Sequence, residues 1–276
     1  MAGAAPFAEL GGRAAIVTGA AQGIGRTAAE TLAAHGMAVV VADTNAERGQ
    51  RVVDGITARG GRAVFAEADV GTRAGCERMV SAAVEHFGGV FALVNNARVG
   101  MGHANAPLAD ILEVDWDRSQ DVLLKSHFLA CKFAIPHMIA GGGGSIVGVS
   151  SLHAQQTNDV EGPYASAKAG VQGLMRSVAV AYGKHGIRAN SILPGGIMTD
   201  VKHEEAALDP TPAPDYNGPE DKSAAGNPVR RRGEAQDIAN AVLYLVSDLA
   251  GFVSGASLVV DGGMGIEIPS SVASRL

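Results

Sequence analysis

The stretch AAIVTGAAQGIG, residues 14–25, joins a short apolar run to a turn rich in glycine. The run predicts a buried strand, and the Ala-rich sequence from residue 24 predicts a helix. Between them, Gly19, Gly23 and Gly25 allow a tight turn that brings backbone N–H groups and the helix N-terminus close to a pyrophosphate. The glycines follow G-x-x-x-G-x-G, so the commoner fingerprint G-x-G-x-x-G matches only loosely, and a plain tight connection is the alternative.

The alternation of strand and helix continues along the chain. Six further runs rich in β-branched residues begin at residues 37, 62, 90, 145, 188 and 257. Helical patterns lie between them, at 24–36, 45–59, 72–87, 113–139, 163–184 and 234–248. Helical crossovers make a sheet parallel and cover both its faces. We therefore expect an α/β fold, a doubly wound parallel sheet of seven strands in a single domain over 1–276.

One long irregular stretch, about 197–228, precedes the last predicted helix. A structureless loop of that length inside a compact domain is usually a lid or is disordered. No linker rich in Pro and Ser divides the chain. The expected core spans 12–263, and residues 264–276 form a tail.

Composition excludes several classes of function. The chain has 276 residues, 47% of them hydrophobic, and a net charge of −6, which leaves no basic face for nucleic acid. Two cysteines cannot build a disulfide framework, and the eight histidines form no HExxH motif, so we expect no metal site. The N-terminus lacks a signal-peptide pattern and no run of 18 apolar residues occurs, so we expect a cytoplasmic protein that binds no membrane.

Asp43 ends the second predicted strand, where a carboxylate can accept both ribose hydroxyls of an adenosine. The additional phosphate of NADP would face this charge, and a close like-charge pair costs about 4 kcal/mol at an effective dielectric of 20. Gln22 and Thr44 supply no compensating cation, and Arg48 lies a helical turn further on. The sequence therefore predicts NAD as the cofactor.

The stretch GPYASAKAG, residues 162–170, places Tyr164 and Lys168 four residues apart among small neighbours. Residues at this spacing are neighbours on a helix, so the ammonium can lie beside the phenolic oxygen. A nearby opposite charge lowers a pKa by about one to three units, which turns a phenol into a usable base for an alcohol. Taken alone, such a pair is more often a solvated helix face.

Together, these motifs resemble those of the short-chain dehydrogenases/reductases, in the single-domain branch, over residues 12–263. The family order is kept by TGAAQGIG at 18–25, Asp69-Val70, NNA at 95–97, Ser151 thirteen residues before Tyr164-x-x-x-Lys168, and PGGIMT at 194–199. The resemblance implies a seven-stranded Rossmann sheet, a nicotinamide cofactor and redox chemistry between a secondary alcohol and a ketone. It also implies a homotetramer with contacts through 113–139, 163–184 and the last strand.

The resemblance assigns three catalytic roles: Tyr164 is the general base and acid, Lys168 tunes it and holds the nicotinamide ribose, and Ser151 hydrogen-bonds the substrate oxygen. Asp69 and Val70 correspond to adenine contacts, and Ile197 and Thr199 to contacts with the nicotinamide carboxamide. The full set of implied cofactor-binding residues is Gly19, Gln22, Gly23, Ile24, Gly25, Asp43, Asp69, Val70, Asn95, Ala97, Tyr164, Lys168, Ile197 and Thr199.

Two positions depart from the family pattern. Leu123 stands where the family carries an Asn that links the lysine to solvent through a water. We therefore expect a relay through Ser126, His127 or the ribose hydroxyls, and an ordered water or a polar partner for Lys168 near residue 123. Arg98 stands where a Gly usually lies close to nicotinamide and substrate; it binds an anionic group of the substrate, or turns to solvent or an acidic neighbour.

The sequence does not name the substrate, since specificity in such folds lies in loops, here 98–110, 152–162 and 197–226. The candidate substrate residues are Arg98, His153 and Gly195. His103, Gln155 and Gln156 also fall in these loops, where solvated side chains are the alternative. The leading hypothesis is an NAD-dependent alcohol dehydrogenase or ketone reductase. Its rival, motivated by Leu123 and Arg98, is an NAD(H)-binding sensor that has lost turnover.

Overall fold

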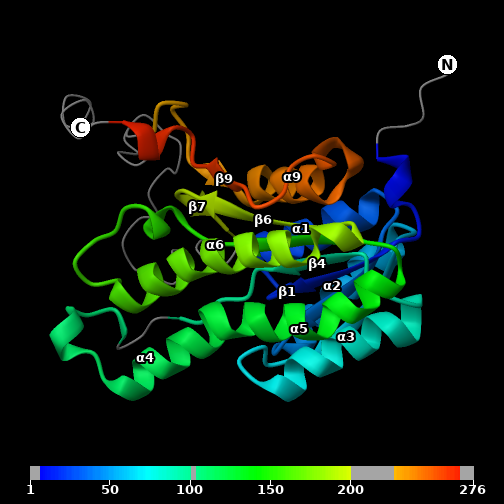
Figure 1. Ribbon diagram of the computed structural model, residues 1–276, viewed down its shortest axis with the longest axis horizontal. Helices are drawn as coiled ribbons and strands as arrows, with labels where there is room; N and C mark the ends of the chain where they lie inside the picture. The colour runs from blue at the N-terminus through cyan, green and yellow to red at the C-terminus, as the bar shows by residue number, and fades with distance from the viewer. Residues whose placement is uncertain (1–6, 101–103, 200–226, 268–276) are drawn as a thin grey trace.

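A computed structural model describes residues 7–100, 104–199 and 227–267, and Figure 1 shows a sheet between two layers of helices. Seven parallel strands form this sheet in the order β3-β2-β1-β4-β5-β6-β9, as predicted. Their bounds are β1 Ala14–Thr18, β2 Ala38–Asp43, β3 Arg62–Glu67, β4 Ala92–Asn95, β5 Gly144–Val149, β6 Ile187–Pro194 and β9 Ser257–Val260.

Helices connect successive strands and cover both faces of the sheet. Two apolar cores result, one under α1, α2 and α9 and the other under α3, α5 and α6. The bounds are α1 Gly23–Ala34, α2 Ala46–Ala58, α3 Arg73–Phe87, α4 Glu113–Gln120, α5 Ser126–Ala140, α6 Gly162–Tyr182 and α9 Ala235–Val246. Strands β1, β4 and β5 are buried along their whole length, which explains why they read as continuous runs rather than as alternating patterns.

The helix predicted over 113–139 is interrupted by a π turn. Its hydrogen-bond register shifts over Asp121–Lys125 (η4), between α4 and α5, and Leu123 at the centre of this turn is fully buried. By length and composition, Glu113–Ala140 is the one helix of the described residues that could cross a membrane. About half of its apolar window, 56%, is buried inside the protein, where α5 packs against α3, so a core position accounts for its composition.

A second sheet of two short strands, β7 Ile197–Met198 and β8 Gly233–Glu234, was not predicted. It pairs the segment that follows β6 with the segment that enters α9. Residues 200–226, most of the predicted irregular loop, lie outside the described residues, as does His103.

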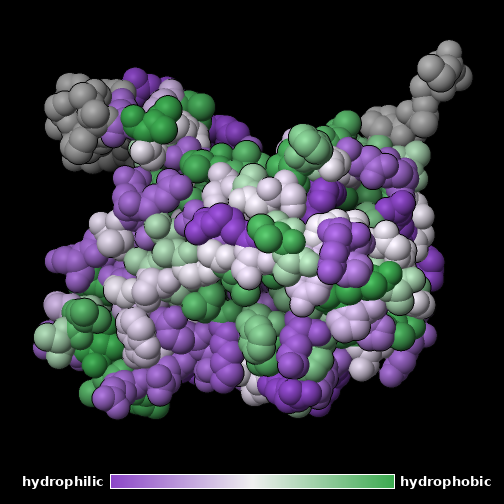
Figure 2. All heavy atoms as spheres, viewed as in Figure 1, coloured by the Kyte–Doolittle hydropathy of each residue, from purple (hydrophilic) through white to green (hydrophobic). Residues whose placement is uncertain are grey.

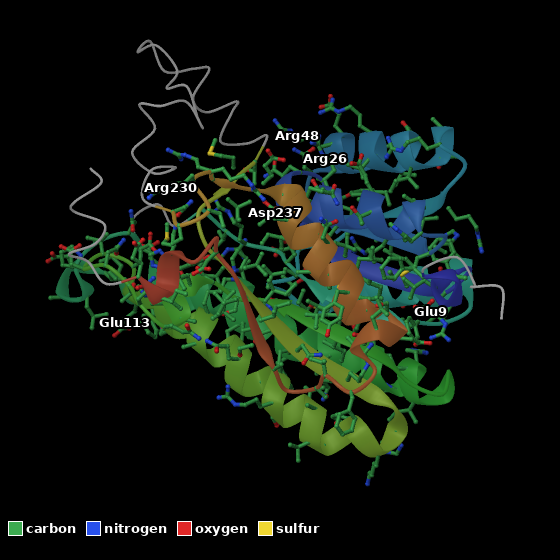
Figure 3. All side chains as sticks on the ribbon, turned by 90° about the horizontal axis from the view of Figure 1, so that it is seen from above. Glu9, Arg26, Arg48, Glu113, Arg230 and Asp237 are labelled. Carbon is green, nitrogen blue, oxygen red and sulfur yellow. The ribbon has the colours of Figure 1, made fainter. Side chains whose placement is uncertain are left out.

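The strand order reverses between β1 and β4. In an open parallel sheet, the loops that leave two such strands diverge to opposite faces and open a crevice at the carboxyl ends. Seen from above, Arg26, Arg48 and Asp237, each near the start of its helix, lie at the same end of the molecule (Figure 3). The first turns of α1, α2 and α9 therefore gather at the end of the molecule where this crevice opens.

Candidate active site

A cavity of about 960 Å³ opens at this crevice. It runs from the glycine loop and Asp43 at one end to Tyr164 and Lys168 at the other. The volume is at the upper end of the ~300–1,000 Å³ typical of small-molecule sites, as a dinucleotide together with a substrate requires.

The glycine loop forms one wall of the cavity. Gly19 and Gly23 adopt φ of +63° and +57°, a left-handed conformation that favours glycine. A Cβ on Gly19 would lie only 2.8 Å from the Cα of Ala97, and a Cβ on Gly25 would collide with the carbonyl oxygen of Gly19. The first two glycines therefore shape the turn, and Gly25 permits close packing of α1 against it. Gln22 makes no side-chain cap to α1, and the N-terminus of a helix favours an anion.

Asn96, which sequence reasoning passed over in favour of Asn95, fixes the loop to β4. Its Nδ2 donates to the carbonyl oxygens of Thr18 (2.9 Å) and Gly19 (3.3 Å), while the hydroxyl of Thr18 accepts from the backbone N–H of Asn96 (2.9 Å) and of Ala97 (3.0 Å). Asn95 instead is buried below the cavity, and its Nδ2 has no hydrogen-bond partner among the described residues. The sequence could have pointed to Asn96, because it follows directly after Asn95, the last buried residue of β4.

Asp43 lies at the end of the cavity away from Tyr164, and backbone N–H groups hold its carboxylate. Its Oδ2 accepts from the N–H of Ala21 and its Oδ1 from the N–H of Asn45, both at 3.0 Å. Arg48 comes closer than its sequence position suggested, because its Nη1 donates to Oε1 of Gln22 in the glycine loop at 2.8 Å. A carboxylate and a guanidinium therefore both stand near the loop.

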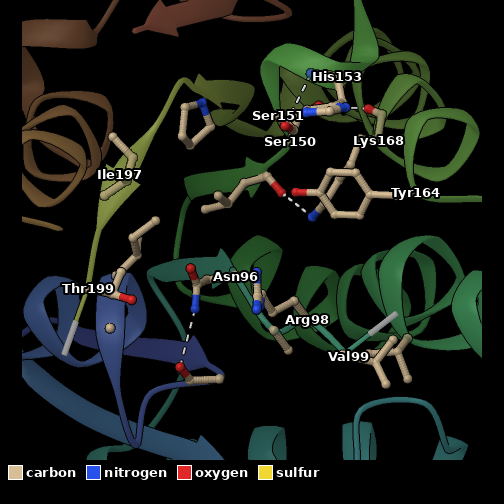
Figure 4. Close-up of a pocket in the computed structure, with 18 of the residues that line it drawn as sticks. Asn96, Arg98, Val99, Ser150, Ser151, His153, Tyr164, Lys168, Ile197 and Thr199 are labelled. Carbon is tan, nitrogen blue, oxygen red and sulfur yellow. Dashed lines mark hydrogen bonds between the residues drawn. The ribbon is translucent and has the colours of Figure 1, made fainter. Parts of the chain in front are cut away.

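Helix α6 and the end of β5 bring the reacting groups together. Tyr164 lies in the first turn of α6, Lys168 one turn later, and the Lys168 Nζ is 5.6 Å from the centre of the Tyr164 ring (Figure 4). The Ser150 hydroxyl donates to the Lys168 carbonyl oxygen at 2.7 Å, and the buried Nζ donates to the Val149 carbonyl oxygen at 2.8 Å. The phenol and the ammonium share one face of the helix, as the spacing predicts.

The pKa of Tyr164 is raised, whereas the spacing of Tyr164 and Lys168 led us to expect that the lysine would lower it. Burial is the largest effect and raises the pKa, while the nearby Ser151 hydroxyl and then the charge of Arg98 lower it. The pKa of Lys168 itself is lowered to about 7, first by burial and then by the charge of Arg98. An ammonium that is only partly protonated near neutral pH contributes less positive charge, so in the cofactor-free protein burial of the phenol prevails.

Among the described residues, Lys168 Nζ donates to the carbonyl of Val149 and to no side chain near residue 123, and an ordered water there stays a prediction. Ser126 donates to the Val122 carbonyl at 2.6 Å and lies 3.3 Å from Nδ1 of His127. Burial, and then the charge of Lys168, lowers the pKa of His127 to about 3, so its ring is neutral. His127 and Ser126 therefore form a buried polar pair within the electrostatic reach of the lysine, and the relay through them stays a prediction.

Ser151 and His153 close the cavity above Tyr164. The Ser151 Oγ accepts from the His153 backbone N–H at 3.2 Å, which leaves its O–H able to donate into the cavity. The His153 ring packs edge-on against the Tyr164 ring at 5.8 Å, and its Nδ1 lies 2.7 Å from Oε2 of Glu161. The serine therefore caps a short turn and also faces the reacting groups.

Of the residues assigned to catalysis, the cofactor or the substrate, all but two line this one cavity. Gly25 and Asn95 lie behind its wall. Gln156 lines it, whereas Gln155 does not. Within the described ranges, no group of three or more His, Cys, Asp or Glu side chains has the arrangement of a metal site. The predicted residues that line the cavity are Gly19, Gln22, Gly23, Ile24, Asp43, Asp69, Val70, Ala97, Arg98, Ser151, His153, Tyr164, Lys168, Gly195, Ile197 and Thr199.

The buried lysine gives stability a pH dependence that can be measured. Between its folded pKa of about 7 and its ordinary value of 10.5, the unfolded chain holds a proton that the folded protein lacks. The free energy of unfolding of the wild type should therefore rise with pH across this window relative to Lys168→Met. Urea unfolding of both cofactor-free proteins at pH 7 and pH 9.5 measures it. A difference between the two that does not change with pH would contradict the prediction.

Comparisons with known proteins agree with this geometry. The family model described as enoyl-(acyl carrier protein) reductase matches residues 19–265. L-Rhamnose 1-dehydrogenase (NAD(P)(+)) of Sphingomonas sp. (strain SKA58) is 38% identical over 77% of this chain and 80% of its own length. Glucose 1-dehydrogenase 2 of Bacillus subtilis (strain 168) is 34% identical over 94% of this chain and 96% of its own.

A solved structure extends the likeness to three dimensions. 7α-Hydroxysteroid dehydrogenase of Escherichia coli (strain K12) is 37% identical over 92% of this chain and 95% of its own. A 7α-hydroxysteroid dehydrogenase complexed with NADH and 7-oxo glycochenodeoxycholic acid superposes with a TM-score of 0.82 at 37% identity, covering 92% of this chain and 94% of that one. The chain thus belongs to the short-chain dehydrogenase/reductase family, oxidoreductases that move a hydride between a nicotinamide dinucleotide and an alcohol or ketone.

Proposed function

We propose that this protein is an NAD-dependent dehydrogenase or reductase of a secondary alcohol and its ketone. The observation that carries the proposal is the convergence of Tyr164, Lys168 and Ser151 on one cavity that also holds the glycine loop and Asp43. The residues present fit a dinucleotide, since the glycines allow the turn to pack closely against Ala97 and lead into the N-terminus of α1, which favours a pyrophosphate. When bound, the nicotinamide supplies the hydride acceptor or donor.

The side chains of the site handle the proton and the substrate oxygen. The Ser151 O–H donates to that oxygen and holds it beside the phenol of Tyr164. During oxidation the Tyr164 oxygen accepts the hydroxyl proton, and during reduction it returns a proton. Burial opposes the phenolate this requires, so the positive charges of Arg98 and of protonated Lys168 must offset it. Hydrogen bonds from Lys168 to the nicotinamide ribose would favour its charged form.

The preference for NAD is argued from Asp43. Its carboxylate is held rigidly by two backbone N–H groups and cannot easily turn away from an additional ribose phosphate. Arg48, which is hydrogen-bonded to Gln22, is the cationic residue nearest to Asp43 in the sequence. Its charge would weaken the repulsion between Asp43 and the additional phosphate of NADP. A relative named for NAD(P)(+) shows that the family tolerates both cofactors. We infer that the fixed carboxylate prevails and that NAD is the better cofactor.

The alternative of an inactive NAD(H)-binding sensor gains no support. All three residues that the chemistry needs are present in one cavity, and the relatives named above are dehydrogenases. Leu123, which motivated the alternative, lies buried in the π turn and does not line the cavity.

A homotetramer is the assembly we propose. Large apolar side chains lie exposed on the elements expected to meet: Phe128 on α5 (49%), Val180 on α6 (87%) and Val259 on the edge strand β9 (38%). Figure 2 shows residues of intermediate and high hydropathy, white and green, between hydrophilic ones along the α6 face. A cytoplasmic location is also proposed, supported by two cysteines that are both free and buried.

Turnover tests the proposed function directly. With NAD and a panel of secondary alcohols that includes sugars and hydroxysteroids, the wild type should reduce the cofactor, and Tyr164→Phe should lower kcat by about 100-fold or more because the base is lost. NADH binding, followed by fluorescence, should persist in that variant. Tyr182→Phe, at the far end of the same helix, is the matched control. Tight NADH binding by the wild type without turnover of any substrate would favour the sensor.

Cofactor choice provides a second test. Catalytic efficiency should be higher with NAD than with NADP, and Asp43→Ala should narrow the preference by about tenfold or more, equivalent to about 1.4 kcal/mol, mainly by improving NADP. Steady-state kinetics with both cofactors measures it, and Asp54→Ala on the exposed side of α2 controls for a general loss of negative charge. Equal efficiency with both cofactors in the wild type would refute the assignment.

The assembly is tested by size. Light scattering at micromolar protein concentration should give four times the mass of the 28.0 kDa chain, because the exposed apolar faces described above are then covered. A stable monomer would refute the tetramer.

A further inference from the structure

Arg98 directly follows Ala97, just beyond the carboxyl end of β4. Figure 4 shows its side chain directed into the cavity, toward Tyr164 and Lys168. The residue is exposed, so its guanidinium is open to whatever occupies this end of the cavity. An arginine here is a further group available for binding, next to the residues that carry out the proton transfer.

The protein does not neutralise this guanidinium within the described residues. Three acidic side chains line the cavity, and each is engaged elsewhere: Asp43 with backbone N–H groups, Asp69 with Arg118 (3.5 Å), and Glu161 with His153 (2.7 Å). No hydrogen bond or ion pair joins Arg98 to another described residue. Glu161 acts on Tyr164 as well, but its carboxylate is paired with His153, so Arg98 has no carboxylate partner among the described residues.

Two basic side chains, Arg98 and Lys168, lie near one phenol, and this arrangement does not stabilise the folded protein. Like charges repel, and Arg98 opposes protonation of Lys168. Cavities lined by one sign of charge concentrate ligands of the opposite sign. A guanidinium binds a carboxylate through two parallel N–H···O bonds, which fixes the orientation of the bound molecule as well as its position.

We propose that Arg98 binds a carboxylate of the substrate, so that the preferred substrates are hydroxy acids and the matching oxo acids. The proposal rests on the proposed function and adds a substrate class to it. The carbinol carbon must then lie close to the carboxylate, because the same molecule has to reach Tyr164 with its hydroxyl and Arg98 with its charge. An arginine at this point would select such acids over neutral alcohols of the same size.

Matched substrates test the proposal. Hydroxy acids of increasing chain length and their methyl esters differ only in the charge that Arg98 would bind. The wild type should prefer the acid by about 10- to 100-fold in kcat/KM, mainly through KM. Arg98→Leu should abolish that preference, and any change in kcat caused by loss of its charge near Tyr164 should affect acids and esters alike. Arg98→Lys should retain part of it. Arg118→Leu, which removes a cation from the same cavity beside Asp69, should not change the acid-to-ester ratio.

A binding measurement separates this proposal from the proposed function. In Tyr164→Phe saturated with NADH, calorimetry should show oxo acids binding about 10-fold or more tightly than their esters, and addition of Arg98→Leu should remove the difference. No turnover of any alcohol, with this binding intact, would refute the proposed function alone. Turnover of neutral alcohols with equal rates for acid and ester would refute the role of Arg98 alone. Loss of NADH affinity in Arg98→Leu, with the acid-to-ester ratio unchanged, would make it a cofactor residue and overturn the proposal.

Discussion

The site depends on the hydrogen bonds that tie the glycine loop to the end of β4. The side chain of Asn96 donates to the backbone of Thr18 and Gly19, and the hydroxyl of Thr18 accepts from two N–H groups of the β4 segment. These bonds join the two strands between which the strand order reverses. Because they hold the loop within van der Waals contact of Ala97, they set both the width of the phosphate cradle and the point from which Arg98 enters the cavity.

At the other end of the cavity, burial of Lys168 lowers the stability of the folded protein. Lys168 is almost completely buried with one carbonyl as its hydrogen-bond partner, and its low pKa shows that the protein disfavours its charge. The phenol beside it is likewise disfavoured as an anion. The ammonium of Lys168 and the phenolate of Tyr164 would stabilise each other. A bound nicotinamide cofactor would add ribose hydroxyls as partners for the lysine, and its oxidised ring would add positive charge near the phenolate. We therefore expect cofactor binding to stabilise the charged forms of Lys168 and Tyr164, which the cofactor-free protein disfavours.

The sequence predicted what depends on local pattern. Continuous β-branched runs revealed the buried strands, and the i, i+4 spacing of Tyr164 and Lys168 gave their shared face. It did not predict the π turn, because DVLLK contains neither Pro nor Gly to mark a change of register. Two-residue strands such as β7 carry no periodicity. The choice between Asn95 and Asn96 depends on which side chain turns toward the loop at the strand end, and the pKa of Tyr164 depends on how much protein covers it.

The two cations of the site differ in a way that decides their roles. The ammonium of Lys168 loses its proton near neutral pH when the site is empty, whereas the guanidinium of an arginine is always charged in proteins. Burial raises the pKa of Tyr164, and the Ser151 hydrogen bond and then the charge of Arg98 oppose that rise. The permanent positive charge near Tyr164 in the cofactor-free protein is therefore that of Arg98. A glycine at position 98 would supply no such charge. The arginine thus changes the electrostatics of the general base as well as the surface that a substrate meets, and an anion bound to it would return part of that effect by raising the phenol's pKa.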